Sequence, residues 1–169
     1  RGGVWTPDGR RLVFAARAGG AGGGGEESLY WQMADGSGTP EALTKTEAQF
    51  FPTSFSPDGT RLLFDRSRPP AFDIAVLALD GTREIKNLLP TSFNEMSAEV
   101  SPDGRWLAYQ SNESGRAEVY VRPFPDVNAG RWQISTDGGT RPMWAHNGRE
   151  LFYLVAPTQA GTPIDKLVA

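Results

Sequence analysis

The sequence Phe55-Ser56-Pro57-Asp58-Gly59-Thr60-Arg61-Leu62-Leu63-Phe64 combines a strand end, a tight turn and the start of a new apolar strand. Similar sequences occupy residues 5–14 and 100–109, and a weaker copy occupies residues 144–153. Their turn positions, taken in the order Pro7, Pro57, Pro102 and His146, are separated by 50, 45 and 44 residues. Four copies at nearly constant spacing predict a repeat protein with units of about 45 residues.

Each copy predicts a hairpin turn followed by a half-buried strand. Proline fixes φ, the aspartate or asparagine side chain caps the turn, and glycine adopts the positive φ that a tight turn needs. The predicted turn residues are Pro7, Asp8, Gly9, Pro57, Asp58, Gly59, Pro102, Asp103, Gly104, Asn147 and Gly148. In the strand that follows, a leucine and an aromatic residue two positions later share one face. These predicted core pairs are Leu12 and Phe14, Leu62 and Phe64, Leu107 and Tyr109, and Leu151 and Tyr153.

Two further strands are predicted after each hairpin. The first set covers residues 29–33, 74–79 and 119–121, and shorter apolar stretches lie near 42–44, 88–89 and 132–134. Four short antiparallel strands per unit are the period and content of a β-propeller blade. We therefore predict an all-β propeller of about four blades, at approximately 1–47, 48–91, 92–136 and 137–169. Because the chain begins at Arg1 rather than at methionine, we expect it to be a segment of a larger propeller protein.

One segment favours a helix when it is considered alone. Thr39-Pro40-Glu41 is typical of a helix start, and residues 42–48 have good helix propensity. The repeat register instead places residues 42–44 in the outermost strand. We follow the register, because four aligned units outweigh one local propensity, and expect at most a helical turn at residues 45–49.

The composition excludes several classes of site. With 20 Gly and 13 Pro among 169 residues, the chain is rich in turns. It contains no cysteine and one histidine, which excludes disulfides, thiolate zinc sites and multi-histidine metal centres. The net charge of −3, with acidic and basic residues interspersed, predicts no nucleic-acid surface. The sequence has no apolar run of about 18 residues, so we expect no membrane insertion by this segment.

No group of residues predicts catalysis, a metal or a cofactor. The Gly-x-Ser-x-Gly motif of serine hydrolases is absent, and His146 occupies a turn position where we expect it in solvent. Asp8, Asp58 and Asp103 belong to successive repeats, so they are expected to lie too far apart to share one ion. The glycine run at residues 19–25 lacks the Gly-Lys-Ser/Thr end of a phosphate-binding loop. We predict that it is a flexible connection between the second and third strands of the first blade.

An aromatic residue, a Pro-Asp-Gly turn and an Arg-x-Leu-x-Phe strand, as in residues 5–14, resemble the WD40-like PD40 repeat of TolB-type propellers. Residues 109–116, 118–125 and 130–139 are similar to the propeller regions that follow the kinase domain in bacterial receptor-like Ser/Thr kinases. The resemblance implies PD40-type blades, a non-catalytic role in protein–protein interaction or ligand sensing, and a periplasmic or other extracytoplasmic location. Prolyl oligopeptidase-like hydrolases also carry propellers, so gating of substrate access is the alternative, and a structural spacer is a third possibility.

The irregular connections are expected to gather at the end of the sheets opposite the Pro-Asp-Gly turns. We predict that this end binds a protein partner or envelope ligand, because arginine and aromatic residues on loops of a rigid scaffold are typical of binding surfaces. The predicted residues are Phe50, Phe51, Arg66, Arg68, Phe93, Asn94, Glu95, Asn112, Arg116 and Arg141. Trp106 stands where the other copies have a charge, and it is predicted either to be an exposed anchor or to pack against the neighbouring blade. Unpaired edges of the terminal blades favour a homo-oligomer.

Overall fold

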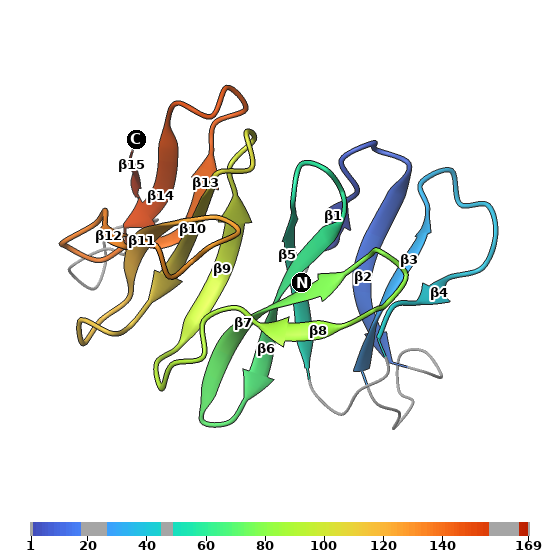
Figure 1. The fold of residues 1–169 in the computed structure, drawn as a ribbon, viewed down its shortest axis with the longest axis horizontal. Coiled ribbons are helices and arrows are strands. Elements are labelled where there is room, and N and C mark those ends of the chain that lie inside the picture. The colour runs from blue at the N-terminus through green and yellow to red at the C-terminus, as the bar shows by residue number, and fades with distance from the viewer. Residues whose placement is uncertain (1, 18–26, 45–48, 156–165, 169) are drawn as a thin grey trace.

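The fold consists of four antiparallel sheets that follow one another along the chain. The computed structural model describes residues 2–17, 27–44 and 49–155, and the backbone of residues 166–168. Its 15 strands form three sheets of four strands and one sheet of three strands, and within each sheet the strand order follows the sequence. We call these sheets blades 1 to 4. The all-β propeller architecture predicted from the repeat is confirmed, and blades 1 and 4 lie at opposite ends of the view in Figure 1.

The strands of each blade run from an inner to an outer position. Blade 1 contains β1 (Val4–Trp5), β2 (Arg11–Arg17), β3 (Glu27–Met33) and β4 (Glu41–Ala42). Blade 2 contains β5 (Phe50–Phe55), β6 (Arg61–Arg68), β7 (Ala71–Ala78) and β8 (Ile85–Asn87). Blade 3 contains β9 (Glu95–Val100), β10 (Trp106–Ser111), β11 (Glu118–Pro123) and β12 (Trp132–Gln133). Blade 4 contains β13 (Thr140–Trp144), β14 (Leu151–Val155) and β15 (Lys166–Val168).

The Pro-Asp-Gly sequences form the turns between the first and second strands. Gly59 has a φ of 71°, and the Asp58 carboxylate accepts the backbone N–H of Thr60 at 3.0 Å. The weaker fourth copy makes the same turn, since Gly148 has a φ of 68° and the Asn147 side chain accepts the N–H of Arg149 at 2.9 Å. The asparagine therefore replaces aspartate as a cap without loss of the hairpin.

A hydroxyl group in front of the proline locks three of these turns. The Ser56 hydroxyl donates to Asp58 at 2.5 Å and accepts the backbone N–H of Arg61 at 3.0 Å. Thr6 and Ser101 make the same pair of hydrogen bonds in blades 1 and 3. Blade 4 has Ala145 at this position and lacks the hydroxyl. Our reading of the sequence missed this position, although it is Ser or Thr in the three regular copies.

The two faces of β6 pack on different neighbouring blades. In β6, Leu62 and Phe64 pack in a cluster with Val13 and Leu29 of blade 1, whereas Leu63 packs in a cluster with residues of blade 3. All three β6 side chains are fully buried. The predicted leucine and aromatic pairs are thus core residues in blades 2 and 3, and they are only partly buried in blades 1 and 4. The hydrophobic core consequently lies between blades.

Adjacent blades also stack through the Pro-Asp-Gly turns. A Cβ atom on Gly104 would lie 3.6 Å from the Pro57 ring, and one on Gly148 would lie 3.6 Å from the Pro102 ring. Glycine is favoured at this position because of its positive φ, and a Cβ atom there would be in ordinary van der Waals contact with the proline of the preceding blade.

The outermost strands differ in position from the prediction. We expected them near residues 42–44, 88–89 and 132–134, but β4 and β8 end before the buried side chains of Leu43 and Leu89. In blade 1 the Leu43 N–H still bonds the Leu29 carbonyl at 2.7 Å, so the chain leaves the sheet as this side chain turns into the core. The predicted helical turn at residues 45–49 falls almost wholly, and the glycine run at residues 19–25 wholly, outside the described residues.

Two further observations complete the fold. Trp106 is half-buried and packs edge-to-face on Trp132 of its own blade, with ring centroids 5.6 Å apart. Among the described residues, no helix is long and apolar enough to cross a membrane.

Candidate functional site

The candidate site is the end of the sheets opposite the Pro-Asp-Gly turns, which we call the loop face. It contains the β6–β7 turn at the lower edge of Figure 1, the β10–β11 turn and the beginnings of the inner strands β5, β9 and β13. Because the inner strands run away from this end and the second strands return to it, residues far apart in the sequence meet here.

The structure separates the ten predicted residues into three groups. The exposed residues are Arg68, Phe93, Arg116 and Arg141, and the half-buried residues are Phe51, Arg66, Asn94 and Asn112. Phe50 and Glu95 are buried and are corrected here, because they are not available to a partner. Phe50 packs edge-to-face on Phe64 with centroids 5.2 Å apart, so the first β5 residue belongs to the core between blades 1 and 2.

Glu95 is a buried acceptor. It is 2% exposed and accepts hydrogen bonds from the hydroxyl groups of Thr91 at 2.5 Å and Ser111 at 3.3 Å. Burial raises its pKa, and the two hydroxyl groups partly offset that effect. Its charge is also close enough to those of Asp73 and Glu113 to be disfavoured by them. Glu95 therefore bonds Thr91 and Ser111 together beneath the loop face.

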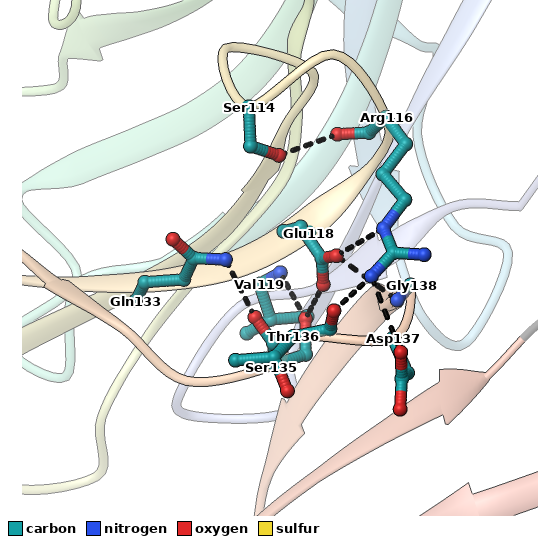
Figure 2. A network of polar contacts seen from close by, with 9 residues as sticks. All are labelled: Ser114, Arg116, Glu118, Val119, Gln133, Ser135, Thr136, Asp137 and Gly138. Carbon is teal, nitrogen blue, oxygen red and sulfur yellow. Dashed lines mark hydrogen bonds and ion pairs between the residues drawn. The ribbon is translucent and has the colours of Figure 1, made fainter.

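Arg116 is fixed on the loop face by a buried carboxylate (Figure 2). Glu118, 1% exposed at the start of β11, accepts the Arg116 Nε–H at 2.7 Å and the Gly138 N–H at 3.0 Å, and it also accepts the Ser135 hydroxyl. The Arg116 guanidinium bonds the Thr136 carbonyl as well. Burial alone would raise the pKa of Glu118, but the hydrogen bonds from Ser135, Gly138 and Arg116 outweigh it and lower the pKa below its ordinary value.

The network around Glu118 ties three segments of blade 3 together (Figure 2). The Ser135 hydroxyl oxygen accepts the Val119 N–H at 2.8 Å, and the Gln133 side-chain amide donates to the Ser135 backbone carbonyl at 2.8 Å. The segment after β12 is therefore bonded to β11 and, through Glu118, to the β10–β11 turn. An equivalent bond in blade 1 joins the Leu29 N–H to the Thr44 hydroxyl at 2.9 Å.

Arg68 repeats this arrangement in blade 2. Its guanidinium lies 2.8 Å from the carboxylate of Asp73, which is 2% exposed near the start of β7 and also accepts the Asn87 side chain at 3.5 Å. Asp73 and Glu118 occupy the same position in their blades, one residue before the buried Ile74 and Val119. The sequence analysis missed both acids. The available signal was a carboxylate near the start of the third strand with an arginine two to five residues before it.

The backbone of Arg141 is held by the neighbouring blade. Its N–H donates to the Gln110 side chain at 3.0 Å while its φ is 50°. The preceding interface uses the same device, because the Ser97 N–H donates to the Asp65 carboxylate at 2.9 and 3.1 Å with a φ of 57°. These bonds cross from one blade to the next at a bulge of the inner strand.

A cavity of about 420 Å³ opens beside these bulges. Phe51, Met96 and Thr140 line it together with the Asp65 carboxylate and Arg141. The cavity therefore brings apolar residues together with the exposed Arg141, while the Asp65 carboxylate in its wall is buried and accepts the Ser97 N–H. Within the described ranges, no three His, Cys, Asp or Glu side chains are placed to hold a metal ion. His146 is exposed in the turn of blade 4, at the other end of the sheets.

Comparisons with known proteins identify the fold. No family model matches the chain. A structure assigned to TolB of Agrobacterium tumefaciens superposes with a TM-score of 0.79 at 21% identity, covering 94% of this chain and 55% of that one. TolB of Acinetobacter baumannii superposes with a TM-score of 0.78 at 22% identity, covering 95% of this chain and 38% of that one. The chain therefore has a TolB-like β-propeller fold.

Two further proteins are similar to this chain. A puromycin-hydrolyzing peptidase of Mycobacterium tuberculosis has a TM-score of 0.66 at 17% identity, with 90% of this chain covering 27% of that one. An uncharacterized protein of Agrobacterium fabrum is 26% identical over 116 residues, which is 69% of this chain and 34% of that protein. The chain thus spans 34% to 55% of the length of this relative and the two TolB proteins, which fits a segment of a larger propeller.

Proposed function

We propose that this propeller segment is a non-catalytic scaffold whose loop face binds a protein partner. The observation that carries the proposal is the fixation of exposed arginines by buried acids. Arg68 and Arg116 each lie against a carboxylate that is almost fully buried, and Arg141 is bonded through its backbone. Arginine side chains that are ordered before binding lose little entropy when they contact a partner, which favours affinity.

The chemistry of the loop face suits a protein surface. Guanidinium groups donate to carboxylates and carbonyl groups, and the exposed ring of Phe93 offers an apolar contact at 39% exposure. Arginine and aromatic residues are enriched among the residues that dominate binding energies. The sheets beneath are joined by hydrophobic clusters between blades 1 and 2 and between blades 2 and 3. Hydrogen bonds also cross between blades 2 and 3 and between blades 3 and 4.

The alternative is a propeller that gates substrate access in a prolyl oligopeptidase-like hydrolase. Its support is weaker, because the Mycobacterium peptidase superposes less closely than the TolB structures do. The coding sequence around this segment discriminates the two. A downstream Gly-x-Ser-x-Gly with its acid and histidine would favour the hydrolase. An upstream kinase domain would favour the receptor-kinase context, which remains a prediction from residues 109–139.

The test of the scaffold proposal is capture of a partner from an envelope fraction of the source cells. The informative variant combines Arg141→Glu with Phe93→Ala, since both side chains are exposed. The matched control is Arg149→Glu, an exposed arginine in the turn at the opposite end. Wild type and the control are expected to retain the same partner, and the loop-face variant is expected to lose it. Equal capture by all three proteins, with unchanged melting temperatures, would refute a loop-face site.

A further inference from the structure

A second hollow lies at the opposite end, between blades 1 and 2. It has a volume of about 700 Å³ and is bordered by the Pro-Asp-Gly turns of both blades. Its apolar lining comes from Trp31, Met33, Phe55 and Leu79, and Arg11 forms part of the wall. The Arg11 guanidinium stacks on the Trp31 ring at 4.1 Å from its centroid. We call this hollow the blade 1–2 cleft.

The chain contains a corresponding but smaller cleft between blades 2 and 3. Its volume is about 290 Å³, and Phe124 and Pro125 of the β11–β12 turn form part of its lining. Phe124 is 8% exposed, and the guanidinium of Arg61 lies over its ring at 6.0 Å from the centroid. Arg61 holds the position in its blade that Arg11 holds in blade 1, two residues after the turn glycine.

A difference in one turn explains why the blade 1–2 cleft is larger. The residue that corresponds to Phe124 is Leu79. The Leu79 N–H donates to the Thr60 carbonyl, and the Phe124 N–H donates to the Arg105 carbonyl, which in each blade belongs to the residue after the turn glycine. The residue that corresponds to Pro125 is Asp80, whose carboxylate instead caps its own turn by accepting the Thr82 N–H at 3.0 Å. The β7–β8 turn therefore supplies neither an aromatic ring nor a proline to the cleft.

We propose that the blade 1–2 cleft binds a segment of a partner protein in which an aromatic residue precedes a proline. The bound ring would lie beside the Arg11 guanidinium, as the Phe124 ring lies beside Arg61, and Trp31 would support the other face of that guanidinium. The partner is a different protein because a second copy of this chain has no such segment to offer. Phe124 is buried, and Phe51-Pro52 belongs to β5, which pairs with β6.

The inference is independent of the loop face, since it concerns the other end of the sheets. The probe is a synthetic peptide with the sequence of residues 121–128, capped at both ends, added to the full 169-residue chain with nitrogen-15 label. Saturable shifts are expected at the Trp31 indole N–H and at the backbone of Arg11, Met33 and Leu79. The same peptide with alanine in place of phenylalanine is expected to bind at least about tenfold more weakly.

Two variants locate the binding. Leu79→Phe places a ring where Phe124 stands in the neighbouring cleft, so it is expected to abolish peptide binding while the melting temperature stays the same or rises. Arg11→Ala is expected to weaken binding, and its matched control Arg61→Ala, in the smaller cleft between blades 2 and 3, is expected to leave the affinity unchanged. Arg11→Ala also keeps the test informative if Leu79→Phe fails to fold.

Several results would overturn the inference. They are the absence of a saturable shift, shifts confined to blades 2 and 3, or equal affinity in the Leu79→Phe variant. Shifts of the same residues on raising the concentration of the chain alone, together with a doubled mass, would assign the cleft to a second copy. None of these results bears on capture of a partner by the loop face, so the two proposals fail separately.

Discussion

Ser56, the residue before the turn proline of blade 2, shows how one hydroxyl group stabilises a hairpin. Ser56 is 2% exposed, donates to Asp58 and accepts the Arg61 N–H, so it satisfies a backbone donor at the first residue of β6. Its hydroxyl, followed by the backbone and hydroxyl of Thr60, lowers the pKa of Asp58 to about 2. The carboxylate therefore stays ionised and remains a strong acceptor across the ordinary pH range.

Ser56→Ala is expected to lower the free energy of unfolding by about 1 to 2 kcal/mol, because the Arg61 N–H loses its partner in a nearly buried turn. The converse change, Ala145→Ser, is expected to raise it by up to about 1 kcal/mol by restoring the hydroxyl to blade 4. Urea denaturation of the two variants and the wild type measures both effects. Equal stability of Ser56→Ala and wild type would show that the hydroxyl is replaceable by water.

Glu99 makes stability depend on pH near neutrality. It lies on β9, accepts the Trp144 N–H of blade 4 at 3.3 Å, and burial raises its pKa to about 7, partly offset by that hydrogen bond. The ordinary value is 4.5, so the folded state binds the proton more tightly than the unfolded state does. The contribution of Glu99 to stability is full below the ordinary value and is lost as pH rises through the folded value.

Glu99→Gln is therefore expected to raise the melting temperature at about pH 8 and to leave it nearly unchanged at about pH 4, since glutamine accepts the same hydrogen bond without a charge. Thermal denaturation across the pH range checks this. A variant whose stability runs parallel to that of the wild type at every pH would mean that Glu99 does not titrate differently on folding.

At the scale of elements, buried acids connect turns to strands. Glu118 begins β11 and pairs with Arg116 of the turn before it, and Asp73, near the start of β7, pairs with Arg68 at the end of β6. Glu118 additionally bonds the segment that leads to blade 4 through Ser135 and Gly138. The position of that segment thus depends on one carboxylate. In blade 2 the residue corresponding to Ser135 is Leu89, which is buried in a hydrophobic cluster instead of bonded to an acid.

Glu118→Gln is expected to lower the free energy of unfolding by about 1 to 3 kcal/mol, because a neutral amide replaces a buried charged acceptor that has several donors. Amide hydrogen exchange should quicken at residues 135–138. The matched variant Asp73→Asn should leave exchange at those residues unchanged, because the Asp73 side chain bonds only within blade 2 among the described contacts. Unchanged exchange at residues 135–138 in Glu118→Gln would contradict the role of this carboxylate.

At the scale of the whole molecule, the repeat alone was sufficient to predict the architecture. Apolar residues at alternate positions after a fixed turn, repeated at nearly constant spacing, left few folds other than a propeller, and the core pairs Leu62 with Phe64 and Leu107 with Tyr109 are buried as predicted. The candidate site was predictable only in outline. Phe50 follows a loop in the sequence, yet it enters the core because blade 1 covers it.

The contacts that shape both ends of the molecule involve residues from different repeats, and a single repeat does not reveal them. The bond from Ser97 to Asp65 spans 32 positions, and the Arg141 N–H reaches Gln110 across 31. Neither Ser97 nor Arg141 has neighbours in the sequence that would predict such a bond. The reason for the larger size of the blade 1–2 cleft is likewise found only by comparing Leu79 with Phe124. That comparison requires the blades to be aligned in space.

One face of blade 1 is predicted to cause self-association of the 169-residue chain. Trp5 is 56% exposed, whereas Phe55 and Val100, at the same position in the next blades, are 8% and 6% exposed. Leu12 and Phe14, on the same face, are also less buried than their counterparts. Light scattering should show a mass that rises with concentration, and Trp5→Glu with Phe14→Ser should reduce the rise. A mass independent of concentration in the wild type would contradict this.

The contact between a proline and the glycine of the following blade has a consequence for how such a chain lengthens. Pro57 meets Gly104 and Pro102 meets Gly148, so each copy of the motif brings one half of a contact and receives the other half from its neighbour. Duplication of one whole unit in the gene would therefore preserve this proline–glycine contact at the new junction. Blade 4 has His146 where the other three copies have proline, so its sequence has diverged from the pattern that makes this contact.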